Sequence, residues 1–243
     1  MNAFRSKANP TEAEAVAVAI SGRLAPRLRI ATQALGRLLR DPDDTTQVFL
    51  LYVSLNAGSL PDVLRRFAAE PDGPRLMAEK PALDSRSIDF DHLASLPADT
   101  LGVAFARHMR ENGLSPDVFQ SPEGVPPEVA FLIQRLRQSH DLWHVVTGYG
   151  TDVVDELALQ AFTYGQIRSP GPLILSTVGA LRWGLRDPQV IKRVREGYRR
   201  GCDARPLCAL PWELLWETPL TDLRARLGVV PARVLSKAAP RAT

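Results

Sequence analysis

The chain has 243 residues and a formal net charge of +3, with 45% apolar and 23% charged residues. This is ordinary globular composition, which excludes disorder along the whole chain, and the small net charge gives no argument for a nucleic-acid partner. The two cysteines, Cys202 and Cys208, are too few for a disulfide scaffold, and we predict reduced thiols, as in a cytosolic protein.

Neither a membrane span nor a targeting segment is predicted. No stretch is apolar over the roughly 18–20 residues that a membrane-spanning helix needs. Residues 1–10 contain no apolar run of the secretory type, and Glu12 and Glu14 argue against a transit peptide, which is poor in acidic residues. We therefore expect the protein to stay in the compartment where it is made.

Helical patterns recur from the N-terminus, and patterns typical of strands are almost absent. The expected elements of the first half are a helix over 11–39 (or two divided near Pro26), a helix from Thr45 or Thr46 to about Gly58, a helix over 61–69, mostly loop over 71–99, and a helix from Asp99 or Thr100 to Met109.

The second half continues as helices that begin at proline or at a capping residue. The expected helices run from Pro126-Pro127 to Gly148, from Thr151 or Asp152 to about Gln166, and onward from Pro172, Pro188 and Thr218-Pro219, the last ending near Gly228. We predict an all-α fold in which residues 11–230 form a single multi-helix domain. Residues 1–10 and 231–243 are expected to be flexible.

Basic residues gather in one segment of this half: Arg182, Arg186, Lys192, Arg193, Arg195, Arg199, Arg200 and Arg205. A solvated helix face explains such a cluster, and so does a patch that faces phosphate or an anionic membrane surface.

The histidines point to chemistry. His140 and His144 are four positions apart in a predicted helix, so both imidazoles lie on one face, one turn from each other. Glu156 follows beyond the Gly148–Gly150 turn, and a helix returning antiparallel from that turn places it at a similar depth. Two histidines and a carboxylate can chelate one metal ion, and the sequence thus predicts a helical hairpin that carries a metal site.

Asp141 lies beside His140 and is either a fourth ligand or a partner that orients a histidine ring. Gln160 is one turn beyond Glu156 and can hydrogen-bond the same site. Spacing alone also allows these histidines to be ordinary surface residues. The zinc-protease motif HExxH has glutamate where this chain has Asp141, so its general-base role is not transferred. His92 and His108 have no such companions and are expected to be structural.

The pattern His140-Asp141-x-x-His144-x11-Glu156 resembles the HDxxH-x11-E signature of the coenzyme Q biosynthesis protein 4 family. The likeness covers roughly residues 30–230. Further similar segments are 80–83, 96–102, 134–139, 141–148 and 211–229.

The resemblance implies an all-helical fold with one divalent metal ion, zinc or iron, at His140, Asp141, His144 and Glu156. It also implies a role in ubiquinone biosynthesis, with a polyprenylated aromatic lipid and other quinone-biosynthesis enzymes as partners. The missing transit peptide suggests a bacterial relative. The expected location is then cytoplasmic, at the inner face of the cell membrane.

Three functions are consistent with this sequence. We favour a metal-dependent decarboxylase, a lyase that acts at the carboxyl-bearing ring carbon of a prenylated hydroxybenzoate with hydroxylation there. The second is a non-catalytic scaffold that presents a lipid to other enzymes, and the third is a metal-dependent hydrolase. Direct ligation by Asp141 would close the metal site, whereas an outer position would leave it open. A homodimer through apolar helix faces is a default expectation.

Overall fold

The structure is a computed structural model that describes residues 11–41, 44–118 and 124–232. These residues form helices and no strand, apart from an isolated bridge between Thr100 and Pro219, so the predicted all-α class is confirmed. Both predicted flexible ends fall largely outside the described residues. None of the described helices is both long and apolar enough to cross a bilayer.

The helices of the first half are α1 Glu12–Ile20, α2 Leu24–Leu38, α3 Thr45–Asn56, α4 Leu60–Ala69, α5 Gly73–Glu79, α6 Phe90–Ser95 and α7 Leu101–Glu111. Those of the second half are α8 Pro127–Gln138, α9 His140–Thr147, α10 Val153–Ile167, α11 Pro170–Gly184, α12 Pro188–Asp203 and α13 Leu220–Leu227. Short 3₁₀ turns lie at Pro116–Val118 and Trp212–Leu214.

Local sequence sets the helix ends. Thr11 and Glu14 form a reciprocal capping box at α1, and the hydroxyl of Thr100 accepts from the backbone of α7. Gly148 and Gly228 end α9 and α13 in the left-handed conformation that glycine adopts without strain. These caps agree with the sequence patterns.

One expectation was incomplete and one was wrong. Residues 71–99 are mostly loop, as expected, but they also contain α5, whose first turn holds Pro74, and α6, which Asp89 caps. The helix expected from Pro126 to Gly148 is two helices, which meet at Ser139. His140 and Asp141 therefore begin a new helix.

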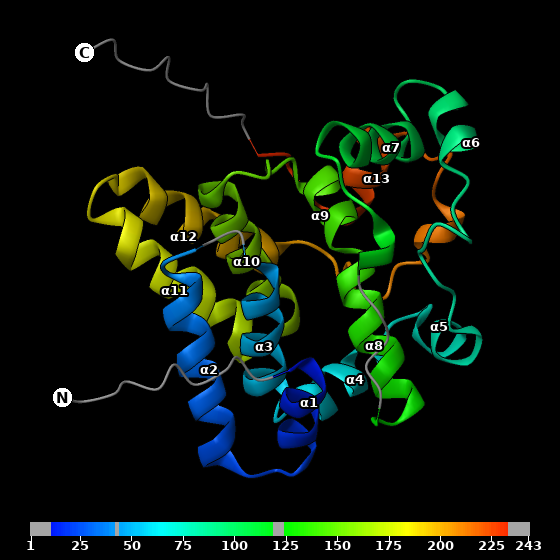
Figure 1. Ribbon diagram of the computed structural model, residues 1–243. Coiled ribbons are helices and arrows are strands. Elements are labelled where there is room, and N and C mark those ends of the chain that lie inside the picture. The colour runs from blue at the N-terminus through cyan, green and yellow to red at the C-terminus, as the bar shows by residue number, and fades with distance from the viewer. Residues whose placement is uncertain (1–10, 42–43, 119–123, 233–243) are drawn as a thin grey trace, which may run out of the picture.

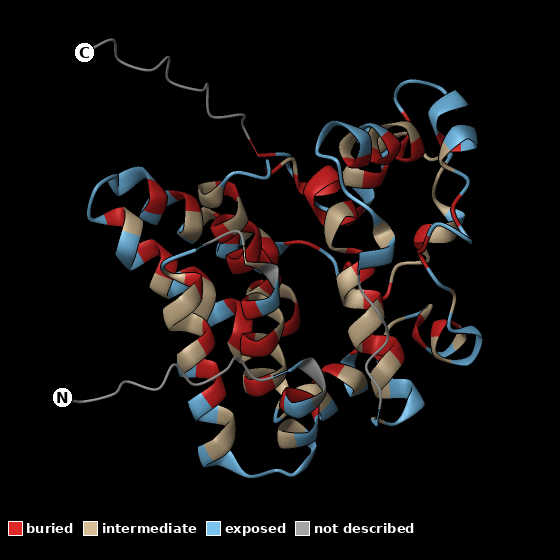
Figure 2. Cartoon of the chain, in the orientation of Figure 1, coloured by how far each residue is buried: buried red, intermediate tan, exposed pale blue. Residues whose placement is uncertain are grey.

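Two hydrophobic clusters form the interior. The larger one joins α4–α10 and α13 and includes Trp143, Phe162 and Trp212, while the smaller one joins α1, α2 and α3. The helix α3 packs on α11, and both α11 and α12 pack on α10. In Figure 1, α7–α9 lie on the other side of α10. Buried residues follow the helix faces that meet in the interior (Figure 2).

Glycines bring α10 and α12 into close contact. A Cβ on Gly197 would lie 2.2 Å from the carbonyl oxygen of Ala158, and one on Gly201 would lie 2.2 Å from that of Phe162. Gly197 and Gly201 are four residues apart on α12, and Ala158 and Phe162 are four residues apart on α10. Each helix therefore uses a single face for the contact. The two helices thus pack backbone to backbone, and α10 also carries Glu156.

The basic segment is only partly a solvated face. Arg193 is buried against Asp155, and Arg200 reaches the carbonyl oxygen of Thr147. Arg182, Arg186, Lys192, Arg195 and Arg199 are exposed. Cys202 and Cys208 are free thiols, the first exposed and the second buried, as the predicted reduced state requires.

Candidate metal centre

The predicted ligands lie on two consecutive helices. His140 and His144 are one turn apart on α9, and Glu156 is in the first turn of α10. The left-handed Gly148 ends α9, and the carboxylate of Asp152 caps α10 by accepting from two of its backbone amides. This short connection brings Glu156 back beside the histidines.

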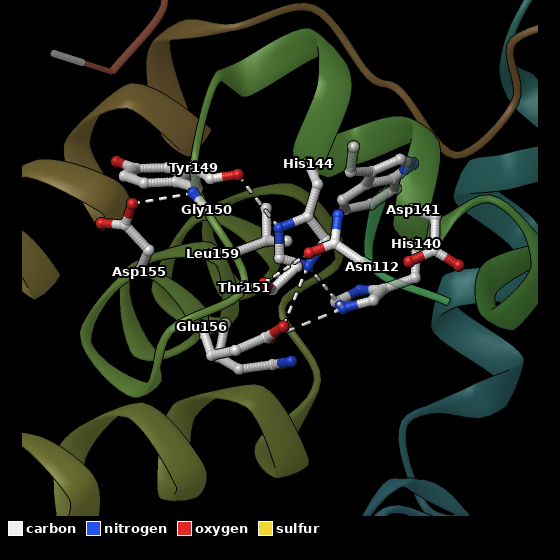
Figure 3. A network of polar contacts seen from close by, with 12 residues as sticks. Asn112, His140, Asp141, His144, Tyr149, Gly150, Thr151, Asp155, Glu156 and Leu159 are labelled. Carbon is white, nitrogen blue, oxygen red and sulfur yellow. Dashed lines mark hydrogen bonds and ion pairs between the residues drawn. The ribbon is translucent and has the colours of Figure 1, made fainter. Parts of the chain in front are cut away.

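The side-chain donor atoms converge on one point (Figure 3). Nε2 of His144 is 3.0 Å from Oε1 of Glu156, and Nε2 of His140 is 3.6 Å from Oε2 of the same carboxylate. The two Nε2 atoms are 3.2 Å apart. All three donors lie within 4.8 Å of one another, so these residues could hold one metal ion.

The electrostatics favour a charged carboxylate at this point. Burial would raise the pKa of Glu156, but hydrogen bonds with His140 and His144 hold it well below its ordinary value. Burial would likewise lower the pKa of His140, and its contact with Glu156 raises it instead. Imidazole nitrogens together with an ionised carboxylate are donor groups that bind a divalent cation. The residues therefore fit the implied metal.

A backbone carbonyl orients the ring of His144. His144 is almost fully buried, and its Nδ1 lies 3.2 Å from the carbonyl oxygen of Tyr149. A histidine that donates from Nδ1 to a carbonyl presents the lone pair of Nε2 to a metal. The backbone at Tyr149 thus orients the ring toward Glu156.

Asp141 lies outside the converging donor group. Its Oδ1 is 3.6 Å from Nε2 of His108 on α7, and that interaction holds the pKa of Asp141 below its ordinary value against the opposing effect of burial. The ring of His108 also stacks on that of His144, with 5.5 Å between the centroids. His108, expected to be structural, is therefore part of this site.

The sequence does not indicate that His108 belongs to the site, because His108 precedes His144 by 36 positions and belongs to no local motif. The packing of α7 on α9 brings them together. Asn112 caps the C-terminal end of α7, four residues after His108, and accepts a hydrogen bond from Thr151 in the connection between α9 and α10.

We predict that Asp141→Asn retains the metal and loses activity. Asparagine keeps the shape of the side chain, and the carboxylate it replaces faces His108 and not the three donors. Metal content per chain should match that of the wild type, whereas turnover falls about 10- to 100-fold, as for a group that orients a ligand. Loss of the metal in this variant would identify Asp141 as a ligand.

Gln160, expected to hydrogen-bond the same site, contacts α3. Its amide oxygen accepts a hydrogen bond from the hydroxyl of Tyr52 on α3. Burial and the nearby charge of Glu156 raise the pKa of Tyr52 far above its ordinary value, so its hydroxyl stays protonated. Tyr52 was not expected from the sequence, which shows only an apolar run there.

Residues 19–233 match the family model of the coenzyme Q (ubiquinone) biosynthesis protein Coq4. The chain belongs to the Coq4 family. It is 33% identical over 195 residues to the mitochondrial ubiquinone biosynthesis protein COQ4 homolog of Drosophila ananassae, a match that covers 79% of this chain and 73% of the relative. The homolog of Drosophila simulans is 30% identical over 216 residues, covering 87% and 79%.

A solved structure agrees. The crystal structure of a protein from Nostoc punctiforme assigned to ubiquinone biosynthesis superposes with a TM-score of 0.69 at 27% identity, and covers 83% of this chain and 96% of that one. The Coq4 family is a family of ubiquinone biosynthesis, so the resemblance in the histidine motif is confirmed at the level of family and pathway.

Proposed function

We propose that this Coq4 protein is a metal-dependent decarboxylase of ubiquinone biosynthesis. It would replace the ring carboxyl group of a polyprenylated hydroxybenzoate by a hydroxyl group from water and release carbon dioxide, while dioxygen accepts the two electrons and leaves as hydrogen peroxide. The observation that carries the proposal is the donor set of His140, His144 and Glu156. Two imidazoles and one carboxylate leave coordination positions open for a substrate and for oxygen.

When bound, a divalent ion would act as a Lewis acid on the ring carboxylate or a neighbouring phenol oxygen as carbon dioxide departs. Residues of the chain set the charge of Glu156 and the orientation of His144. Glu156 stays ionised because both histidines face it, and the carbonyl of Tyr149 fixes the ring of His144. His108 stacks on the ring of His144 and pairs with Asp141, and this packing would restrict the movement of that ring.

The test is carbon dioxide release from a prenylated 4-hydroxybenzoate labelled at the carboxyl carbon. Wild-type protein loaded with iron or zinc should release label under air, and Glu156→Gln should release at least about 100-fold less. A metal-loaded wild type that binds the substrate but releases no label would contradict the decarboxylase and favour a lipid-presenting scaffold.

A prenylated substrate resides in a membrane, and we propose that the protein binds the membrane surface through the turn between α11 and α12. Leu185 is 90% exposed there, and Leu181 and Ile191 are also exposed. Arg186 directly follows Leu185 and Lys192 directly follows Ile191, and both cations are exposed. Apolar residues surrounded by cations fit the surface of an anionic bilayer.

The charge-reversal variant Arg182→Glu/Arg186→Glu/Lys192→Glu should bind anionic vesicles at least about tenfold more weakly, since each surface cation contributes about 1 kcal/mol. Cosedimentation with phosphatidylglycerol vesicles measures this. The matched control, Arg29→Glu/Arg40→Glu/Arg107→Glu, reverses three exposed cations elsewhere and should retain more binding. Equal loss in both variants would remove the assignment to this turn.

A further inference from the structure

The interior face of α12 contains a cation that the proposed chemistry does not use. Arg193 is 6% exposed, and both its Nε and its Nη2 contact Oδ1 of Asp155, at 2.8 and 2.7 Å. The other carboxylate oxygen, Oδ2, accepts from the backbone amide of Gly150 at 2.7 Å. One carboxylate thus connects α12, α10 and the turn before α10. Figure 3 shows its contact with Gly150.

This turn sets the orientation of His144. Gly150 directly follows Tyr149, whose carbonyl oxygen receives Nδ1 of His144. The ring of Tyr149 lies 5.0 Å from the guanidinium of Arg193 and 5.0 Å from that of Arg200. The ring of Tyr149 therefore contacts α12 directly. The backbone that follows it, at Gly150, is connected to α12 through Asp155 and Arg193.

The place of Arg193 is itself fixed by close packing. Arg193, Gly197 and Gly201 recur every four residues, so they share the face of α12 that meets α10. The glycines leave no room for the helices to shift without contact, and Arg193 meets Asp155 one residue before Glu156. The ion pair thus also fixes the rotation of the first turn of α10, which carries the ligand.

We propose that Arg193 and Asp155 are positioning residues of the metal centre. They hold the Tyr149–Gly150 backbone so that Nδ1 of His144 donates to a carbonyl and Nε2 faces the ion, while Glu156 is directed to the same point. This inference rests on the proposed metal site. The ordinary alternative is an ion pair that stabilises the fold alone, and buried pairs of that kind are often replaceable by neutral residues.

The experiment is a titration with Co²⁺ and a chelator competition with Zn²⁺ on the purified full chain. The test variant is Arg193→Met/Asp155→Asn, which removes both charges and leaves no unpaired ion in the interior. The matched control is Arg135→Met/Glu213→Gln, which removes another ion pair, joined at 2.7 Å between the buried Arg135 of α8 and the half-buried Glu213 of the Trp212–Leu214 turn. Melting temperature without metal is measured for each variant.

The test variant should bind both ions 10- to 100-fold more weakly than the wild type, roughly the effect of losing an outer partner of a ligand. The control should stay within about threefold of wild-type affinity, even if its melting temperature falls further. In the zinc-loaded wild type, imidazole nitrogen NMR should show a slowly exchanging proton on Nδ1 of His144, and exchange should be faster in the test variant.

Wild-type affinity and unchanged proton exchange in the folded test variant would overturn the proposal. Should the test variant fail to fold, Asp155→Asn alone is used with the same two readouts. A wild type that binds neither ion would instead overturn the metal site itself, so the two failures are distinguishable.

Discussion

Replacing His144 with alanine is expected to lower metal affinity on the order of a thousandfold. Structural zinc sites bind with about 10–16 kcal/mol shared among their ligands, so one imidazole contributes about 3–4 kcal/mol. His144 is also the donor nearest to Glu156, at 3.0 Å, and the one whose other nitrogen is already engaged. Chelator competition with Co²⁺ or Zn²⁺ measures the change.

His92 provides the control for this variant. It is an exposed histidine on α6, and His92→Ala should leave the affinity unchanged. Because His144→Ala also removes volume from the interior, Glu156→Gln is a second test that keeps the shape of the ligand. Undiminished affinity in both site variants would show that the metal binds elsewhere.

The second large effect is on stability. Gly201→Leu should lower the free energy of unfolding by about 3 kcal/mol or more, because even a Cβ at this position would lie 2.2 Å from the carbonyl oxygen of Phe162. The helices α10 and α12 must separate to accommodate it. For a chain of this size the melting temperature should fall by about 6–12 °C.

Gly36 on α2 is the matched control, since a Cβ there meets nothing within 4 Å. Gly36→Ala should be neutral or should stabilise by up to about 1 kcal/mol through the better helix propensity of alanine. Thermal unfolding followed by circular dichroism compares the two variants. A Gly201→Leu protein that melts with the wild type would mean that the close approach of α10 and α12 is wrong.

The part of the site that follows from helix periodicity could be predicted from the sequence. Four-residue spacing places His140 and His144 on one face, and the glycines after α9 signal the turn that returns Glu156. These signals are local. The position of Asp141 stayed open, because a residue at the first turn of a helix can face either the ligands or a neighbouring helix.

The remaining contributors are brought in by tertiary packing. His108 comes from α7, Tyr52 from α3 and Arg193 from α12, each far from the motif in sequence. Arg193 looked like one cation in a basic surface segment, since the spacing to Gly197 and Gly201 acquires meaning only against α10. Composition and local sequence pattern do not show that this face of α12 packs on α10.

The helices, too, were predictable only where local sequence signals mark them. The all-α class and most helix starts follow from caps and prolines, whereas α5 and α6 were missed. The prolines of residues 71–99 were taken as breakers, although Pro74 lies in the first turn of α5, where its missing amide is tolerated. The helix α6 contains no proline and begins at the cap Asp89. Ser139 gave no signal for the end of α8, because both flanking sequences favour helix.

The proposed function depends on a metal ion held by His140, His144 and Glu156. Its most direct test is elemental analysis of protein purified without oxygen, beside Glu156→Gln purified in the same way. We expect about one equivalent of iron or zinc per chain in the wild type and only background in the folded variant. A wild type without metal after supplementation, or equal metal in both proteins, would contradict it.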